Sequence, residues 1–376
     1  MEETILQFGT GRFLRSFTDL FVHESNAAGS VVGRVVALQS TDSGRAEQLN
    51  QQGGRYHVLI RGERGVETVD EVLVVGSISR ALTAAEEWHE VLDLGRSPGL
   101  RTIVSNVTEV GYRLKEMDEY VRVPPASFPA KLTALLHTRY SAGHDGVTIL
   151  PCELIERNGD RLFGLIVEVA ERWQLARGFI DWLRERCLWA NCLVDRIVTG
   201  APAQHELLSS DQLLSVAEPF AFWAIEMPGD ARCPIEHESI HCVESVDPYA
   251  LRKVRILNGA HTAMALKAMS MGFETVRQCV SDGGIGSWLE ELLIDEIVPV
   301  LEDRVPADEL RPFVHETLDR FCNPFIEHEL KTISWEQTAK VETRLLPSYR
   351  EYRERFHTDP PLLSSLIEAA GIRTDG

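Results

Sequence analysis

One segment in the second half of the chain carries three side chains suited to proton transfer and to hydrogen bonding with oxygen. It contains Lys253, Asn258 and His261. On an α-helix with 100° per residue, the amine, the amide and the imidazole lie within an arc of roughly 140°. Interconversion of an alcohol and a ketone needs such groups. Lys253 would transfer the proton, with a pKa lowered from about 10.4 by burial, Asn258 would stabilise the alkoxide, and His261 would orient the oxygen.

Two further points concern this segment. Gly259 would leave open backbone beside the three side chains, which would let a cofactor ring approach closely. The alternative is a partly exposed helix face with a solvated lysine and a core histidine.

A glycine-rich turn follows the first predicted strand, which ends at Phe8. Gly9 permits a tight strand-to-helix turn, and Gly11 lets the backbone approach a pyrophosphate at a helix N-terminus. Leu14 replaces the usual third glycine, so a turn without any ligand is the alternative. We expect cofactor contacts from the residues of the turn: Gly9, Thr10, Gly11, Arg12 and Phe13.

A second candidate cofactor segment follows the predicted strand 101–105. Its polar residues would lie at the carboxyl end of a parallel strand, where ligands bind in such sheets. A helix-capping box formed by Ser105 and Thr108 is an equal alternative. The expected cofactor contacts here are Ser105, Asn106, Thr108 and Glu109.

The end of the second predicted strand bears on the choice of cofactor. NAD-binding proteins usually carry an acid there for the ribose, and this chain has none directly at the strand end. Asp42 would serve NAD if it reached back, whereas Ser40 and Arg45 would suit a 2′-phosphate. We therefore expect NAD without excluding NADP.

The patterning of apolar residues indicates which elements position these groups. The first half alternates strands and helices, a pattern typical of βαβ units and a mostly parallel sheet. After about residue 160 helices dominate, and one long helix is predicted from Asp247 to Met271, with Pro248 tolerated near its start. We predict an α/β fold with a Rossmann-type dinucleotide-binding domain over 1–200. A mainly α-helical substrate and catalytic domain would follow over 201–376.

Composition limits the class of protein. The chain has 376 residues, 44% hydrophobic and 25% charged, which is ordinary for a globular protein. Its formal net charge of −19 argues against binding to nucleic acid or to an anionic membrane. No apolar run approaches the roughly 18 residues of a membrane span, and the acidic N-terminus does not resemble a signal peptide. The seven scattered cysteines indicate reduced thiols in a cytoplasmic protein.

Two further groups of residues are candidates for a chemical or structural role. Cys233, His237, His241 and Cys242 are dense in soft ligands, but neighbouring residues of a strand point to opposite faces, so we expect no metal site. Asp195-Arg196 would orient the lysine helix or form a structural ion pair, with the structural role favoured.

With both motifs given, the chain resembles the polyol-specific long-chain dehydrogenase family, which includes the mannitol dehydrogenases. The glycine motif of that family matches Gly9, Gly11, Phe13 and Arg15, and its lysine, asparagine and histidine match the spacing of Lys253, Asn258 and His261. The resemblance is strongest to the branch that acts on keto-sugar acids. Leu154 after Cys152-Glu153 disfavours mannitol itself.

The resemblance implies a zinc-independent NAD(H) or NADP(H) oxidoreductase in which the lysine is the acid/base. It favours interconversion of a keto-sugar acid and its aldonate, with tagaturonate and altronate as the implied pair. Arg320 would bind the carboxylate through two parallel hydrogen bonds, with Lys331 as another candidate and His328 as a further substrate contact. A dehydrogenase of a polyol or a polyol phosphate, and a catalytically silent nucleotide sensor, are the alternatives. The oligomeric state is not predicted.

Overall fold

The computed structural model describes residues 1–41, 44–64, 67–119, 123–229 and 231–373, apart from the side chains of Arg64 and Glu109. The chain divides into two compact units. The first comprises Met1–Ile60 and Glu71–Val246, and the second Arg61–Asp70 and Asp247–Gly376. The sequence places the boundary at residue 200, whereas the contacts divide the chain after Val246. The reason is that strands after residue 200 pair with earlier strands of the first unit.

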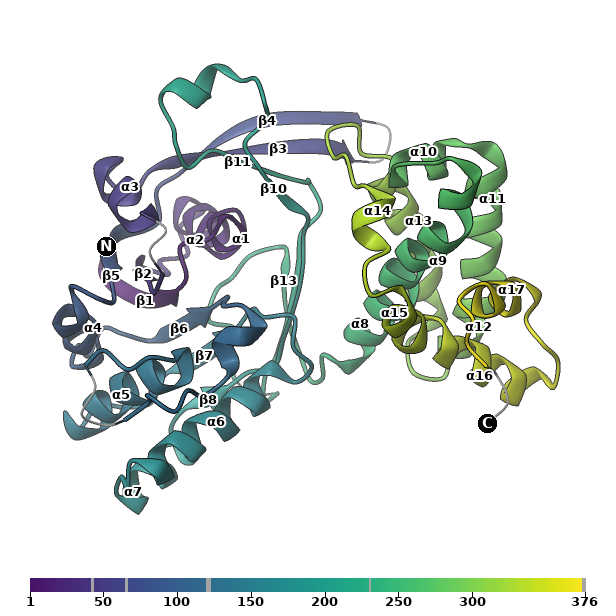
Figure 1. Ribbon diagram of the computed structural model, residues 1–376. Coiled ribbons are helices and arrows are strands. Elements are labelled where there is room, and N and C mark those ends of the chain that lie inside the picture. Colours follow the sequence, from purple (N-terminus) through teal and green to yellow (C-terminus); the bar gives the residue numbers. More distant parts are fainter. Residues whose placement is uncertain (42–43, 65–66, 120–122, 230, 374–376) are drawn as a thin grey trace. The chain divides into compact units, whose positions relative to one another are not determined.

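A six-stranded parallel sheet organises the first unit (Figure 1), as predicted. Its spatial order is β5 (Ile78–Thr83), β2 (Arg34–Gln39), β1 (Glu3–Phe8), β6 (Thr102–Ser105), β7 (Thr148–Pro151) and β8 (Leu188–Trp189). In the register of the central strands, Phe8 lies opposite Leu38 on one side and Ser105 on the other. The carboxyl ends of β1, β2 and β6 therefore lie at the same edge of the sheet.

Helices cover both faces of this sheet. Figure 1 shows α4, α5 and α6 on one side and α1 and α2 on the other. Because side chains alternate along a strand, Leu6 and Phe8 pack into the core with α4 to α7, while Gln7 points to the opposite face and contacts Asp19 of α2. The helices of this unit are α1 (Arg12–Arg15), α2 (Thr18–Ala27), α3 (Arg45–Gln51), α4 (Trp88–Gly95), α5 (Phe128–Ser141), α6 (Asn158–Arg172) and α7 (Arg177–Glu185), with 3₁₀ turns η1 (Glu109–Tyr112) and η2 (Glu206–Ser209).

Two smaller sheets contain the other described strands. One has the order β10 (Val198–Gly200), β11 (Ser215–Ala217), β3 (Tyr56–Arg64) and β4 (Glu67–Val75). The other has the order β13 (Ile240–Val243), β12 (Phe222–Glu226) and β9 (Cys192–Asp195). Two sequence predictions change. The apolar pattern predicts one helix from Gly11 to about Asn26, but the structure breaks it at Ser16 and Phe17 into α1 and α2. The pattern also predicts a helix from Ala84, but that helix begins at Trp88, and the strand β5 that precedes it was missed.

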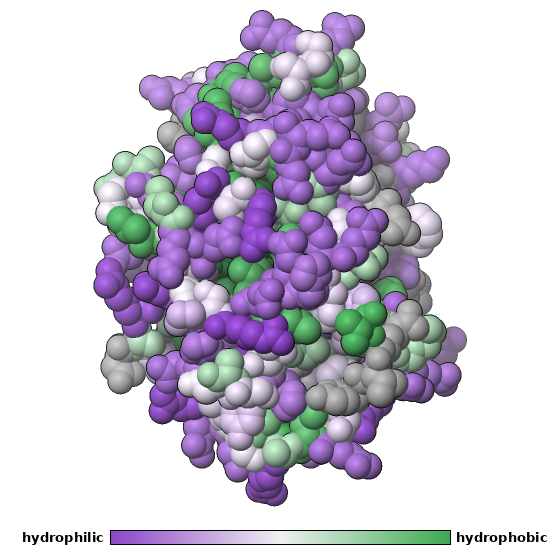
Figure 2. All heavy atoms as spheres, turned by 90° about the vertical axis from the view of Figure 1, so that its left-hand side faces the viewer, coloured by the Kyte–Doolittle hydropathy of each residue, from purple (hydrophilic) through white to green (hydrophobic). Residues whose placement is uncertain are grey.

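Along the described chain, no helix combines the length and the apolar character needed to cross a bilayer. The face shown in Figure 2 is mainly hydrophilic, and its hydrophobic residues form small, separate groups. On the described part of this face we therefore see no extended apolar docking surface.

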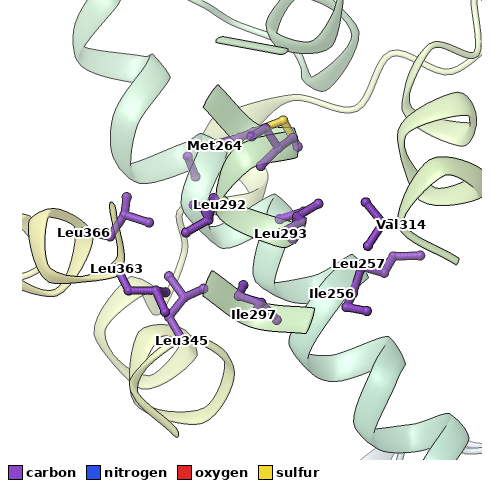
Figure 3. Packing of buried hydrophobic residues seen from close by; sticks show 14 of the residues in the cluster. Ile256, Leu257, Met264, Leu292, Leu293, Ile297, Val314, Leu345, Leu363 and Leu366 are labelled. Atoms are coloured by element: carbon purple, nitrogen blue, oxygen red, sulfur yellow. The ribbon is translucent and has the colours of Figure 1, made fainter. Parts of the chain in front are cut away.

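The second unit is helical, as predicted. Its core includes Ile256, Leu257 and Met264 on the lysine helix, which pack with Leu293 and Ile297 (Figure 3). Its elements are α8 (Asp247–Arg252), η3 (Lys253–Leu257), α9 (Asn258–Ala268), η4 (Met269–Met271), α10 (Val276–Ser281), α11 (Gly283–Glu291), η5 (Leu292–Ile297), α12 (Val298–Leu301), α13 (Ala307–Phe321), α14 (Leu330–Ile333), α15 (Gln337–Arg344), α16 (Leu346–Phe356) and α17 (Pro361–Ala369).

Two turns in this unit, η3 and η5, are π-helical. Pro299 follows η5 and lacks a backbone N–H, which accounts for a widened turn at that point. The long predicted helix ends as expected, with Gly272 in the left-handed conformation at φ +90°.

Candidate functional site

The glycine turn sits at the carboxyl edge of the parallel sheet, where its two glycines have different surroundings. Gly9 has φ +126°, and a Cβ added there would lie 3.2 Å from the carbonyl oxygen of Asn106. A side chain at Gly9 would therefore strain the turn itself. A Cβ added at Gly11 would meet no described atom within 4 Å. The backbone at Gly11 thus borders open space that a ligand can fill.

Buried side chains hold the carbonyl groups of the turn. Gln7 Nε2 donates to the Gly9 carbonyl at 3.1 Å, and Arg15 Nη1 donates to the Thr10 carbonyl at 2.7 Å. Arg15 Nη2 also donates to the carbonyl of Leu213 at 2.9 Å. These hydrogen bonds engage the two carbonyls within the protein and so fix the backbone of the turn.

The end of α1 is held in the same way. Tyr56 OH donates to the carbonyl of Arg15 at 2.9 Å, and Arg196 Nη1 donates to the carbonyl of Ser16 at 2.9 Å. Arg196 also binds the carbonyl of Glu218 through Nε and Nη2. Arg196 therefore has a structural role at the glycine turn. The sequence favoured a structural role for this residue but expected an ion pair.

A buried carboxyl group lies beneath this turn. Asp19 Oδ2 accepts hydrogen bonds from Gln7 Nε2 at 3.2 Å and Tyr56 OH at 3.4 Å. Burial raises the pKa of Asp19 from 3.8 to about 7, although the hydrogen bond from Gln7 and the charge of Arg15 act in the opposite direction. Its charge therefore changes near neutral pH.

The second cofactor segment lies beside the glycine turn. Asn106 N donates to the carbonyl of Phe8 at 3.2 Å, which places the segment next to Gly9. The side chains of Ser105 and Asn106 are engaged within the unit, because Ser105 Oγ donates to Glu153 Oε2 at 3.2 Å and Asn106 Nδ2 to the carbonyl of Cys152 at 2.6 Å.

The alternative capping box does not form in this segment. Thr108 directly precedes η1 and makes no side-chain capping bond, and Glu109 is the first residue of that turn. Sequence reasoning missed the carboxylate that organises the segment. Glu153 also accepts from Val107 N at 2.9 Å and Tyr112 OH at 2.9 Å, and burial raises its pKa. Its position two residues after β7 was the available signal.

The residues considered for cofactor choice are only partly described. Asp42 lies outside the described residues, and Ser40 is exposed. Arg45 is the first residue of α3, which follows Gly44 at φ +69°. Gln39 at the end of β2 accepts a hydrogen bond from Ala46 N at 2.8 Å, so its amide fixes the start of α3. This geometry favours neither NAD nor NADP.

The lysine helix contains a π-helical turn at Lys253–Leu257, which the sequence did not predict. In a π-helix the backbone bonds link residues five apart, so Lys253 and Asn258 lie one turn apart. His261 follows Asn258 by three residues of α-helix and thus lies on the next turn. The three side chains therefore occupy consecutive turns, in a narrower arc than an unbroken α-helix would give.

The turn is anchored by Arg255, which is buried. Its Nε donates to Ser348 Oγ at 2.7 Å, and its guanidinium pairs with Glu351. Both partners belong to α16. The packing of η3 against α16 therefore fixes the part of the helix that carries Lys253.

Aromatic rings surround the candidate catalytic histidine. The His261 ring lies 4.4 Å from that of Phe321 and 4.7 Å from that of His328, measured between centroids. Burial lowers the pKa of His328, which favours its neutral form. Arg320 is buried in the last turn of α13, one residue before Phe321. The structure thus brings His328 to His261, as expected for residues of one site.

Helix α15 covers another side of α9. Gln337 Nε2 donates to the carbonyl of Thr262 at 3.1 Å, and Arg344 Nη1 donates to Thr262 Oγ1 at 3.1 Å. A Cβ added at Gly259 would lie 3.5 Å from Leu345 Cδ2. The expectation of open backbone at Gly259 is therefore wrong, because α15 and the residue after it pack there.

The cysteine–histidine group does not form a metal site. Cys233 and Cys242 are joined by a disulfide, so the expectation that all seven cysteines are reduced is wrong. His237 Nε2 bonds with Glu24 Oε2 at 2.9 Å, and His241 stacks on Phe222. In the portion of the chain that is described, no three His, Cys, Asp or Glu residues are placed to hold a metal ion.

A Rossmann-type unit with a glycine turn at its carboxyl edge, together with a helical unit that carries a Lys–Asn–His helix, defines a two-domain dehydrogenase. The model of the mannitol dehydrogenase Rossmann domain matches residues 3–236, and that of the mannitol dehydrogenase C-terminal domain matches residues 245–372. The chain belongs to the mannitol dehydrogenase family.

Relatives in sequence carry a more specific name. Altronate oxidoreductase of Yersinia enterocolitica is 38% identical, over 98% of this chain and 79% of that protein. Altronate oxidoreductase of Bacillus subtilis is 38% identical, over 94% of this chain and 76% of that protein. The match covers most of each protein.

Solved structures support the fold. Substrate-free D-sorbitol dehydrogenase has a TM-score of 0.86 at 22% identity, covering 98% of this chain and 80% of that chain. Mannitol 2-dehydrogenase of Pseudomonas fluorescens, solved with NAD and D-mannitol, has a TM-score of 0.79 at 21% identity, covering 98% of this chain and 78% of that chain.

Proposed function

We propose that the protein is an NAD(H)-dependent oxidoreductase that interconverts a keto-sugar acid and its aldonate, with tagaturonate and altronate as the pair. The observation that carries this proposal is the placement of Lys253, Asn258 and His261 on consecutive turns of one helix. The relatives named altronate oxidoreductase support the substrate class. Its partner is a small sugar acid, and a cytoplasmic location remains a prediction from the sequence.

The first unit holds the dinucleotide in this proposal. The residues of the turn, Gly9 to Phe13, form the pyrophosphate site, because no described atom lies within 4 Å of a Cβ added at Gly11 and the backbone there is open to a ligand. Ser105, Asn106, Thr108 and Glu109 continue the cofactor site along the same edge. When bound, the nicotinamide accepts or supplies the hydride.

The second unit supplies the proton transfer. During reduction, Lys253 Nζ gives a proton to the oxygen that was the carbonyl, and during oxidation it takes that proton back. Asn258 Nδ2 donates a hydrogen bond to the same oxygen and stabilises its developing negative charge. His261 orients the oxygen, and the contact with Phe321 restricts the position of its ring.

Two further residues contact the substrate in this proposal. His328 lies against the His261 ring and is held neutral by burial, which suits a hydrogen bond to a sugar hydroxyl. Arg320 precedes Phe321, whose ring touches His261, and its guanidinium is a candidate contact for the carboxylate.

A substrate panel tests the function. Initial rates are measured for tagaturonate, a neutral ketose and a ketose phosphate, each with NADH and with NADPH. We expect the highest kcat/KM for tagaturonate with NADH. A higher value for the ketose phosphate would favour a polyol-phosphate dehydrogenase. NADH binding without turnover of any substrate would favour a nucleotide sensor.

A further inference from the structure

Arg344, the last residue of α15, lies directly against the candidate catalytic helix. Its Nη1 donates to Thr262 Oγ1 at 3.1 Å and approaches the carbonyl of Asn258 at 3.5 Å. Thr262 and Asn258 lie one helical turn apart, on the helix that also carries Lys253. The guanidinium is therefore fixed beside the backbone of a residue that is proposed to bind the reacting oxygen.

The surroundings of this guanidinium differ from those of Arg252 and Arg255 in the same unit. Arg344 is half-buried, and burial lowers its pKa. Among the described residues, no carboxylate lies within ion-pair distance of it, and only Nη1 makes a hydrogen bond. By contrast, Arg252 pairs with Glu309 at 3.1 Å, and Arg255 pairs with Glu351. Arg344 thus keeps a positive charge in a partly desolvated position without a counterion from the described protein.

A charge in such a position costs free energy unless an anion pairs with it. The requirement is sharper here because the net charge of −19 lowers the concentration of anions near the protein in general. A guanidinium offers two parallel N–H groups that match the two oxygens of a carboxylate. Nη1 is held by Thr262, and Nε and Nη2 make no hydrogen bond to the described residues, so they are free to form such a pair.

We propose that Arg344, rather than the candidate Arg320, binds the carboxylate of the sugar-acid substrate and selects the acid over the neutral keto sugar. This role rests on the proposed function, and it adds a specificity residue that the sequence did not indicate. Thr262 acts as a positioning residue, because its hydroxyl bonds both to the carbonyl of Asn258 and to Arg344.

The test compares Arg344→Met and Arg344→Lys with the wild-type protein. Arg350→Met is the matched control, since it removes the same charge from an exposed position on α16. For each protein, kcat/KM is measured with the keto-sugar acid and with the neutral keto sugar of the same stereochemistry at saturating NADH. The dissociation constant of NADH and the thermal midpoint verify that the variants are folded.

Arg344→Met is expected to lower kcat/KM for the acid by about 10- to 150-fold, the range for loss of a charge-assisted hydrogen bond. The value for the neutral sugar should stay within about twofold, because that substrate has no carboxylate to lose. Arg344→Lys should retain part of the preference for the acid, since lysine keeps the positive charge but lacks the two parallel N–H groups of the guanidinium. Arg350→Met should match the wild-type protein with both substrates.

An equal loss with both substrates would show a structural role and overturn the proposal, and so would an unchanged preference for the acid. Loss of the preference in Arg320→Met but not in Arg344→Met would assign the carboxylate to Arg320 instead. If Arg344→Met does not fold, an unchanged acid preference in folded Arg344→Lys overturns the proposal. Absence of turnover of any sugar acid by the wild-type protein would overturn the proposed function itself, a result distinct from the others.

Discussion

At the scale of residues, the two glycines of the turn have different roles. Gly9 is needed for the fold of the turn, and Gly11 leaves space for a ligand. Gly9 has a positive φ and a close carbonyl neighbour, so the conformation of the turn requires it. Gly11 has an extended conformation, at φ −68° and ψ 159°, that any residue can adopt. A side chain at Gly11 therefore affects a bound ligand more than the folded protein.

This difference gives a direct prediction for the cofactor site. Gly11→Val should raise the dissociation constant of NADH by about tenfold or more, because its side chain fills the space assigned to the pyrophosphate. Titration of NADH fluorescence measures the effect, and the thermal midpoint should hardly change. Gly9→Val, the matched control, should lower the thermal midpoint clearly. Unchanged NADH affinity in folded Gly11→Val would show that the nucleotide binds elsewhere.

Asp19 gives a prediction for pH dependence. The pKa of Asp19 is raised in the folded protein, so folding favours the protonated carboxyl group. Its contribution to the free energy of unfolding is therefore complete below pH 4. That contribution is lost as the pH rises through about 7. The change in the pKa of Asp19 from 3.8 to about 7 corresponds to a contribution on the order of 4 kcal/mol to the free energy of unfolding. Denaturant unfolding of the wild-type protein and of Asp19→Asn from pH 4 to pH 8 measures it. The wild-type protein should lose stability relative to the variant, and parallel curves would contradict the account.

At the scale of elements, the candidate catalytic helix depends on its neighbours for its geometry. The π-helical turn that aligns Lys253 with Asn258 is tied to α16 through Arg255, Ser348 and Glu351. The position of the lysine therefore depends on a helix almost a hundred residues later in the chain.

Glu351→Gln tests this dependence. It leaves the buried Arg255 without its carboxylate, which should lower the free energy of unfolding by about 1–3 kcal/mol, given that Glu351 is partly exposed. Turnover should fall because the turn that carries Lys253 is no longer fixed, whereas NADH affinity should stay unchanged. Chemical denaturation, steady-state kinetics and NADH titration provide the three measurements. A loss of NADH affinity equal to the loss of turnover would argue against a local effect.

The elements also show what local sequence can and cannot predict. The start of the long helix at Asp247 and its end at Gly272 follow from local capping chemistry, and both are confirmed. The π-helical turn within it was missed, because it is accompanied by contacts with α16 that no local pattern contains. The break at Ser16 was missed for a similar reason, since Arg196 and Ser215 bind this residue from far along the chain.

In the candidate site, too, some features follow from local sequence and others depend on distant contacts. The types and spacing of Lys253, Asn258 and His261 were enough to identify a helix face from the sequence alone. The contact between His261 and His328 was predicted only as membership of one site, and Arg344 was not predicted at all. Both depend on how helices pack side by side, which periodicity does not specify.

At the scale of the whole molecule, the disulfide changes the expected chemistry of the cysteines. Cys242 is exposed and Cys233 is half-buried, so reductants can reach the bond. Thiol titration of the unfolded protein should count five free thiols before reduction and all seven after it. Seven thiols without reductant would show that the two cysteines are reduced in the isolated protein.

The division into two units assigns separate tasks in the proposed function. Cofactor binding belongs to the first unit, and proton transfer belongs to the second. A change at Lys253 should therefore affect turnover without affecting NADH binding. This residue is thus the best choice for testing whether the second unit supplies the proton transfer.

The decisive measurement is the steady-state turnover of Lys253→Ala with tagaturonate and NADH, together with its dissociation constant for NADH. We expect kcat to fall by about 10²–10⁴-fold, the usual contribution of a positioned proton donor. The dissociation constant for NADH should stay close to that of the wild-type protein. A folded Lys253→Ala variant that keeps near wild-type turnover would contradict the assignment of Lys253 as the acid/base and, with it, the proposed role of the Lys–Asn–His helix in catalysis.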